Sequence, residues 1–441
     1  MFSSTPGTRS SLKERVWGIV LGSLLTLTVA TALISARTIP FLYAATTIAF
    51  LGAGLRRGKL KVIPPGFGPV AANLGLFLAY ALVSCLWAIS PKVTLTQVSL
   101  VLLITLAAFV LISLLDAEED DNLLHMGEGV WIGFVVALIY VLIESASDQS
   151  IKLWLYNSLG LTPANLEPRR YFTWEGGRLI AISREDLTRS TTPITPFLWP
   201  IVLIVRGMLA KRWSSLAAFS VAALASVVVI ISPHATSKIA LVCGAAAFLC
   251  ALYSVKLIGR LAVIGWIFAC IAVLPAALLA HRLNVHNISW LERTARERIV
   301  IWNHTAQQTL HAPILGRGAD MTYVLGPMLD PTTVAAADEQ FTRRLSIHAH
   351  NVFLQTWFEL GLVGATLLTL AGLALLRAIG SIRPNLQPYA YATFASATVV
   401  AASSYGMWQN WFVAMFAQTA VLFALGRLLS RERSLAGAIP D

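Results

Sequence analysis

The sequence predicts an all-α polytopic membrane protein with about 12 transmembrane helices. Hydrophobic residues make up 56% of the 441 residues and charged residues only 12%, and the mean hydropathy is +0.70. A soluble globular chain carries about 25% charged residues, so this chain has too few to cover itself with a water-facing surface. A spanning helix needs about 20 mostly apolar residues, and such stretches recur along nearly the whole chain.

Twelve apolar stretches fit this requirement, some of them joined by short turns. The predicted spans are residues 17–36, 39–55, 68–88, 93–115, 127–145, 192–210, 213–231, 236–255, 258–280, 350–376, 388–404 and 407–427.

Lys and Arg clusters set the predicted orientation. They lie in the N-terminal arm, in short loops and after the last span, and twelve spans place all of them on one side. By the positive-inside rule that side is the cytoplasm, with both termini. The net charge of +11 therefore indicates membrane orientation, and we expect no nucleic-acid partner. The clusters are Arg9, Lys13 and Arg15; Arg56, Arg57, Lys59 and Lys61; Lys211 and Arg212; Lys256 and Arg260; Arg377 and Arg383; and Arg427, Arg431 and Arg433.

Two long polar loops face outward in this topology, residues 146–191 and 281–349. The second contains a stretch with apolar residues at helical spacing, 290–310, followed by a turn at Gly316–Gly318. We expect residues 1–441 to form a single membrane domain with a helical external cap.

Histidines are concentrated in the second outer loop. Six of the eight lie in it or at its rim, and His350 lies where the chain returns to the membrane. A neutral imidazole, with a pKa near 6.5, can accept a proton from a hydroxyl group there. A metal is not expected, because His348 and His350 are two residues apart and no H-E-x-x-H pattern accompanies them. The four cysteines lie in apolar segments and predict neither a disulfide nor a metal site.

Arginines are the second signal in the outer loops. The planar guanidinium group binds phosphate oxygens in pairs and stays charged, so an arginine-rich membrane edge suits a lipid-linked diphosphate. Pairing with neighbouring acids such as Glu185, Asp186, Glu292 and Glu297, or with lipid headgroups, is the alternative. The outer-loop arginines are Arg169, Arg170, Arg178, Arg184, Arg189, Arg293, Arg296, Arg298, Arg317, Arg343 and Arg344.

Three further residues allow two interpretations each. Lys238, at the outer mouth of a span, can extend to the interface or add a charge beside a diphosphate. Gly361 and Gly364 can let another helix or a lipid approach closely, and helix packing is the simpler role.

Two motifs resemble a known family. His350-Asn351, nine residues and then Gly361-Leu-Val-Gly364 resemble the signature of the O-antigen ligase family. Arg298–Trp302 and His311–Gly318 resemble its Arg-x-x-x-Trp helix and its Gly-x-Gly turn. Thr236-Ser-Lys238 resembles its Ser-Arg pair, with Lys in place of Arg.

The resemblance implies a GT-C-type glycosyltransferase of the bacterial inner membrane with a periplasmic active site. Such an enzyme transfers O-antigen glycan from undecaprenyl diphosphate to the lipid A-core oligosaccharide with inversion, using no metal and no cofactor. His350 would be the catalytic residue, either as a general base or by orienting the acceptor hydroxyl. The diphosphate would be held by Arg298, Lys238, Arg184 and Arg189, with His348, Asn351, Gly361, Gly364 and Trp302 in support.

Two other functions are alternatives to the ligase. An O-antigen polymerase uses the same donor with a second lipid-linked glycan as acceptor. Polymerases often carry an arginine followed eleven positions later by glycine, and none of the outer-loop arginines has this pattern. A membrane transporter would favour matched halves with ionisable residues at mid-membrane, whereas the charges here lie mainly at the membrane edges.

Overall fold

The computed structural model describes residues 12–56, 58, 64, 66–162, 171–209, 211–326 and 348–436. Arg9, Arg57, Lys59, Lys61, Arg169, Arg170, Arg343 and Arg344 lie outside these ranges.

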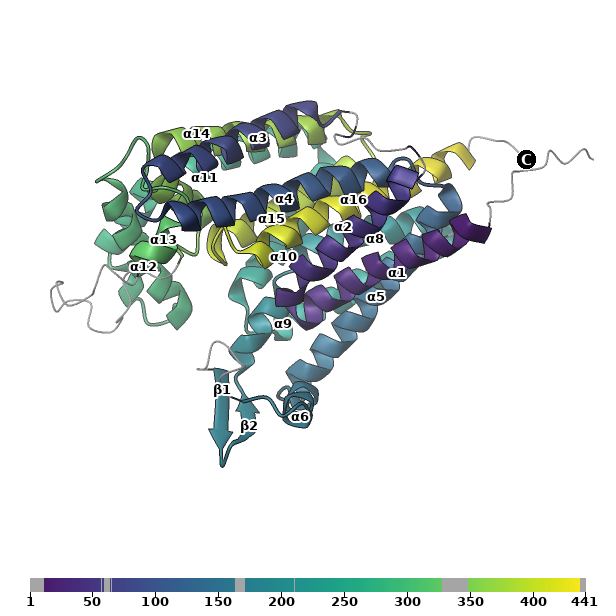
Figure 1. Ribbon diagram of the computed structural model, residues 1–441, viewed down its shortest axis with the longest axis horizontal. Coiled ribbons are helices and arrows are strands. Elements are labelled where there is room, and N and C mark those ends of the chain that lie inside the picture. Colours follow the sequence, from purple (N-terminus) through teal and green to yellow (C-terminus); the bar gives the residue numbers. More distant parts are fainter. Residues whose placement is uncertain are drawn as a thin grey trace, which may run out of the picture. The chain divides into compact units, whose positions relative to one another are not determined.

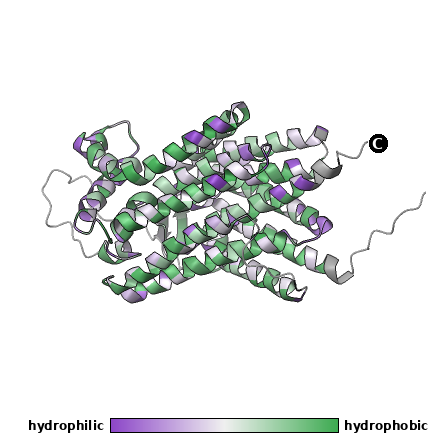
Figure 2. Cartoon of the chain, turned by 90° about the horizontal axis from the view of Figure 1, so that it is seen from above, coloured by the Kyte–Doolittle hydropathy of each residue, from purple (hydrophilic) through white to green (hydrophobic). Residues whose placement is uncertain are grey.

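Within the described ranges, ten helices are long and apolar enough to cross a membrane. Most helices are hydrophobic over most of their length (Figure 2), as contact with lipid requires. The ten helices are α1 (Leu12–Ile34), α2 (Ile39–Arg56), α3 (Gly68–Val83), α4 (Pro91–Leu115), α5 (Asp120–Ala146), α9 (Lys211–Ile231), α10 (Ala235–Tyr253), α11 (Val255–Arg282), α14 (Val352–Ser381) and α16 (Asn410–Ala436).

Two of the twelve predicted spans form shorter helices. They are α8 (Ile194–Met208), with 15 residues, and α15 (Gln387–Ser403), with 17. A straight helix of 15 residues is only about 22 Å long, less than the hydrocarbon thickness of a bilayer. All twelve predicted stretches are therefore helical, and ten of them have full membrane-spanning length.

The chain divides into two compact units. The first comprises Met1–Val62, Ala107–Ala235 and Gln418–Asp441, and the second comprises Ile63–Leu106 and Thr236–Ala417.

In the first unit, α1 packs along α5, and α2 packs against α1 (Figure 1). The close approach of α1 and α5 depends on small residues. A Cβ atom at Gly129 or Gly133 of α5 would lie 2.3 or 2.8 Å from the side chain of Thr26 on α1. Such contacts between small residues are typical of helices packed within membranes.

The first long loop, residues 146–191, contains a β-hairpin that the all-α prediction missed. Strands β1 (Phe172–Glu175) and β2 (Arg178–Ile182) pair antiparallel and pack beside the short helix α6 (Ser150–Ser158). Gly176 and Gly177 both have positive φ, +55° and +81°. This is the backbone of a tight type I′ turn, so a Gly-Gly pair between two apolar runs was the available sequence signal. The loop continues through η4 (Arg184–Asp186) and α7 (Leu187–Thr191).

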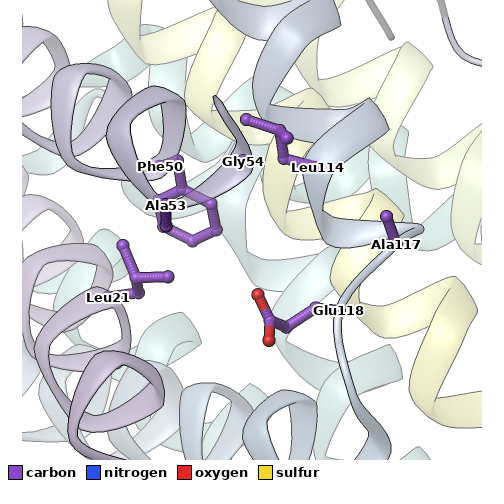
Figure 3. A pocket seen from close by; sticks show the side chains of 7 residues that line it. All are labelled: Leu21, Phe50, Ala53, Gly54, Leu114, Ala117 and Glu118. Atoms are coloured by element: carbon purple, nitrogen blue, oxygen red, sulfur yellow. The ribbon is translucent and has the colours of Figure 1, made fainter. Parts of the chain in front are cut away.

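A small pocket in the first unit lies between α1, α2 and the end of α4 (Figure 3). Its lining is apolar except for the Glu118 carboxylate, which accepts a hydrogen bond from Asn122. None of the residues predicted for the active site lines it.

In the second unit, α3 and α11 both pack against α14 (Figure 1). The loop predicted to form a helical cap, residues 281–349, contains η5 (Val285–Asn287), α12 (Arg293–Thr309) and α13 (Met321–Leu325). Helix α12 confirms the helical stretch expected at 290–310. It contacts both α11 and α14.

Helix α14 is broken at Gly361. This residue has φ +62° and ψ −159°, a conformation that is essentially restricted to glycine. A Cβ atom there would lie 2.3 Å from the carbonyl oxygen of Ile314. The turn at 313–318 therefore fits directly against the break.

Four backbone hydrogen bonds join the turn to the break, two in each direction. The N–H groups of Arg317 and Gly318 donate to the carbonyls of Phe358 and Glu359, at 3.2 and 2.8 Å, and those of Leu362 and Val363 donate to the carbonyls of Pro313 and Ile314, at 2.8 and 3.2 Å. The turn thus supplies partners that the interrupted helix lacks, and an interrupted helix in a membrane protein needs such partners.

The Glu359 side chain holds the same region together with further hydrogen bonds. It is fully buried, and its carboxylate accepts five hydrogen bonds. The donors are the backbone N–H groups of Asp320 (2.9 Å) and Thr322 (3.1 Å), the Thr322 hydroxyl (2.5 Å), the Gln355 amide (2.9 Å) and the Trp408 indole. One carboxylate therefore ties α14 to the start of α13 and to the loop between α15 and α16.

We predict that Glu359→Ala lowers the thermal stability of the protein. Each buried donor left without a partner costs about 1–3 kcal/mol, so the apparent melting temperature should fall by on the order of 5–10 °C. The measurement is thermal unfolding in detergent followed by size-exclusion chromatography. Glu292→Ala removes an exposed carboxylate of the same unit and is the matched control. Equal melting temperatures for the two variants would contradict the role of Glu359.

Candidate active site

The start of α14 is fixed by Asn351. Its side-chain oxygen accepts a hydrogen bond from the N–H of Leu354 at 3.0 Å, the usual way in which Asn caps a helix. The preceding residue, His350, has the left-handed φ of +54°. The Trp302 indole on α12 donates to the carbonyl oxygen of Ala349 at 3.0 Å. The short segment that carries His348 and His350 is thereby held from both sides.

One ring nitrogen of His350 is hydrogen-bonded to the backbone. The Nδ1 atom lies 2.6 Å from the carbonyl oxygen of Ser404, which follows the last residue of α15. Because a carbonyl can only accept, this contact requires a proton on Nδ1. In the neutral ring Nε2 then carries the lone pair, so Nε2 is the atom that can accept a proton.

His348 lies edge-on to His350, with 4.0 Å between the ring centroids and 81° between the ring planes. Gly406 makes this position possible, because a Cβ atom there would lie 2.8 Å from the Cβ of His348. The half-buried ring of Tyr405 lies 6.4 Å from that of His348, centroid to centroid.

Arg298 on α12 is linked to the same end of α15. Its Nη1 atom donates to the hydroxyl oxygen of Thr236 on α10 at 3.3 Å, and the hydroxyl of Ser403 donates to that oxygen at 3.2 Å. Burial lowers the pKa of Arg298, while negative charge on Tyr405, Glu292 and Glu297 would raise it. Among the residues with described side chains, no carboxylate forms an ion pair with Arg298. Its charge is therefore not neutralised within this part of the protein.

The C-terminus of α15 thus brings the histidine and the arginine together. Ser403 is joined to Arg298 through Thr236, and the next residue, Ser404, holds His350. The Ser404 hydroxyl is buried and has no hydrogen-bond partner among the described residues. A proton acceptor and a fixed cation on neighbouring residues of one turn can deprotonate a hydroxyl and stabilise a departing anion.

Known proteins are similar in sequence to this chain over the same region. Residues 221–369 match the family model described as O-Antigen ligase. A Rickettsia typhi protein named as a candidate polysaccharide ligase is 24% identical over 344 residues, 77% of this chain and 76% of the relative. A Rickettsia prowazekii protein with the same kind of name is 23% identical over 344 residues, with the same two shares.

The resemblance to the O-antigen ligase family is thereby confirmed for residues 221–369, which include the segments around His350 and Arg298. The matched region ends before Ser403 and Ser404.

The structure brings together five of the predicted residues, His348, His350, Asn351, Arg298 and Trp302, through the contacts given above. Gly361 and Gly364 shape the break in α14. A Cβ atom at Gly364 would lie 2.1 Å from the Cβ of Leu360, across the break. A close approach was expected between helices at these two glycines. At Gly361 the turn at 313–318 makes the close approach instead, and at Gly364 another part of α14 does.

Lys238 lies apart from the Arg298 contact. It is exposed on α10, two residues after Thr236, and two residues of a helix are about 200° apart around its axis. Thr236, rather than Lys238, meets Arg298.

The two remaining predicted residues belong to the first unit. Arg184 donates to the Asp148 carboxylate at 2.7 and 2.9 Å, so it has the acidic partner that the alternative interpretation of the arginines required. Arg189 lies in the last turn of α7. Their predicted binding of diphosphate stays a prediction.

Sequence reasoning missed Ser403, Ser404 and Tyr405. Their contacts depend on a backbone carbonyl and on ring packing, which no motif encodes. The available signal was a polar Ser-Ser-Tyr-Gly turn between two apolar stretches.

For metals, the described residues contain no group of three or more His, Cys, Asp or Glu side chains that could hold an ion.

Asp320 is a second buried carboxyl group beside Glu359. Burial, and after it the Glu359 carboxylate, raise its pKa well above the ordinary value, to about 8. The folded protein therefore retains a proton that the unfolded chain releases above about pH 4. The stability gained from this proton is complete below that pH and is lost as the pH rises through the folded-state pKa.

We predict that Asp320→Asn makes the protein more stable than wild type at pH 8, with a smaller difference at pH 5.5. Asn stays neutral and tolerates the left-handed backbone of this position, φ +60°. The measurement is the apparent melting temperature of both proteins at the two pH values, where each kcal/mol corresponds to roughly 2–4 °C. A difference that does not change with pH would show that Asp320 keeps no proton in the folded state.

Proposed function

We propose that the protein is an O-antigen ligase of the bacterial inner membrane, with its active site on the periplasmic face and both termini in the cytoplasm. It would transfer O-antigen glycan from undecaprenyl diphosphate to a sugar hydroxyl of the lipid A-core oligosaccharide. The family match supports ligase chemistry in general. The contact between His350 and Ser404 carries the more specific proposal, because it leaves Nε2 of His350 as a proton acceptor.

The proposed reaction is a single displacement. Nε2 of His350 takes the proton of the acceptor hydroxyl, and the hydroxyl oxygen forms a bond to the anomeric carbon of the donor. The bond from that carbon to the diphosphate oxygen breaks, and the electron pair leaves with the diphosphate. Attack opposite the leaving group inverts the anomeric configuration.

Arg298 is proposed to stabilise the leaving diphosphate. Charge accumulates on the diphosphate as the bond breaks, and a positioned guanidinium group stabilises that charge without the need for a metal. The Thr236 hydroxyl oxygen accepts a hydrogen bond from one guanidinium nitrogen. Lys238, Arg184 and Arg189 remain candidates for further contacts with the donor, and His348 supports His350 by ring packing.

We predict that His350→Asn abolishes ligation while the protein still folds. Asn tolerates the left-handed backbone of residue 350, so the variant removes the base and leaves the chain path unchanged. Loss of a general base slows a reaction by roughly 10²–10⁴-fold. The test is complementation of a ligase-deficient Gram-negative strain that makes the matching core. Lipopolysaccharide is displayed on a gel, and protein amounts in the membrane are measured.

His125→Ala is the control, since it removes an exposed histidine of the first unit. The proposal expects a ladder from wild type and from His125→Ala, and none from His350→Asn. A full ladder from His350→Asn would remove the base from the mechanism. Failure of the wild type here, together with restored chain length in a polymerase-deficient strain, would replace the ligase by a polymerase.

A further inference from the structure

Helix α6 in the first unit exposes large apolar side chains and buries its charged side chain, the opposite of the arrangement expected for a helix in water. Its large apolar residues are exposed: Ile151 is 39% exposed, Trp154 68% and Leu155 42%, with Leu159 at the helix end 63%. Lys152, the charged residue of the helix, is 7% exposed. The apolar positions follow the spacing i, i+3, i+4 and i+8, so they share one face of the helix.

Polar contacts hold α6 in this orientation. The Lys152 ammonium group forms a buried ion pair with Asp186 at 2.6 Å. The Asn157 side chain bonds both backbone groups of Leu179 on β2, accepting from its N–H at 3.1 Å and donating to its carbonyl at 2.8 Å. Rotating the apolar face inward would break these contacts and leave a buried charge without a partner. The exposure of Trp154 is therefore a fixed property of this unit.

The position of α6 in the chain places it at the boundary of the membrane. Helix α5, which is long and apolar enough to span, ends at Ala146. Asp148 and Gln149 then both take left-handed φ, +49° and +62°, and α6 begins at Ser150. In Figure 1 the chain turns sharply here, and α6 is seen almost end-on while α5 runs across the view. The two helices therefore run in different directions.

Helix α5 itself exposes an apolar stripe up to this boundary. Ile132, Val136, Ile139 and Ile143 are all 44–57% exposed and lie at helical spacing. Such a stripe on a spanning helix faces lipid, and α6 follows it after only a few residues. Trp side chains are enriched where hydrocarbon meets headgroups.

We propose that α6 is an interfacial helix that lies in the membrane surface at the C-terminal end of α5. Its face of Ile151, Trp154, Leu155 and Leu159 contacts lipid acyl chains near the headgroups. An amphipathic helix binds the interface in this way, with its polar side away from the hydrocarbon. The polar side of α6 holds the hairpin, so the helix anchors the first outer loop to the lipid surface.

Site-directed spin labelling tests this proposal independently of the enzymatic activity. Cys85, Cys243, Cys250 and Cys270 are replaced by alanine in the full chain, which is reconstituted in vesicles of phosphatidylethanolamine and phosphatidylglycerol. Single cysteines at Ile151, Trp154 and Leu155 are labelled in turn, and collision rates with oxygen and with a water-soluble nickel complex are compared.

Two matched positions calibrate the measurement. Val136→Cys reports a label on the apolar stripe of α5, and Glu175→Cys reports one on the exposed end of the hairpin. The proposal expects the three α6 labels to favour oxygen, as at position 136. Nickel collisions like those at position 175 would overturn it. Low collision rates with both reagents would also overturn it, because they would mean that protein, including a second copy of this chain, covers the face.

Discussion

A helix that stops hydrogen-bonding inside an apolar segment must find other partners for its backbone, and this constraint organises the second unit. At Gly361 the partners come from the turn at 313–318, which exchanges four backbone hydrogen bonds with α14. Only glycine at 361 and at 316 leaves room for the two chains to meet, since a Cβ at Gly316 would lie 2.3 Å from the carbonyl of Glu359. The Gly-x-Gly turn and the Gly-x-x-Gly segment, distant in sequence, are therefore two halves of one structural element.

Glu359 extends that element toward the proposed active site. Its carboxylate accepts from Trp408, and Gln355 accepts from the N–H of Met407 at 3.2 Å, so both bind the loop between α15 and α16. The same loop begins with Ser404, which holds His350, directly after Ser403, which is linked through Thr236 to Arg298. The break in α14 thus positions the loop between α15 and α16. This loop in turn positions His350, the proton acceptor, and Arg298, the cation.

The sequence predicted the helices well because lipid leaves few alternatives for a long apolar stretch. All twelve expected stretches are helical, and the cap helix lies where the spacing indicated. The histidine, arginine and tryptophan motifs lie within the region that matches the family model. A local signal that was overlooked accounts for one error, the Gly176-Gly177 turn of the hairpin. Helical phase places Lys238 and Thr236 on different sides of α10.

The remaining differences could not be predicted because they depend on contacts distant in sequence. Whether Gly361 packs against a helix or breaks one is decided by the turn some 45 residues earlier. The partner of Arg184 is Asp148, 36 positions away. Ser404 acts on His350 through its carbonyl group, which every residue has, so no residue type marks that role.

The most direct test of this account is hydrogen–deuterium exchange of wild type and Gly361→Ala in detergent. Gly265→Ala, a helical glycine of α11 with open space around it, is the control. The account predicts that Gly361→Ala speeds exchange in three segments together: the turn at 312–320, the start of α14 and the loop at 404–409. Faster exchange confined to α14, with the turn and the loop as protected as in wild type, would contradict it.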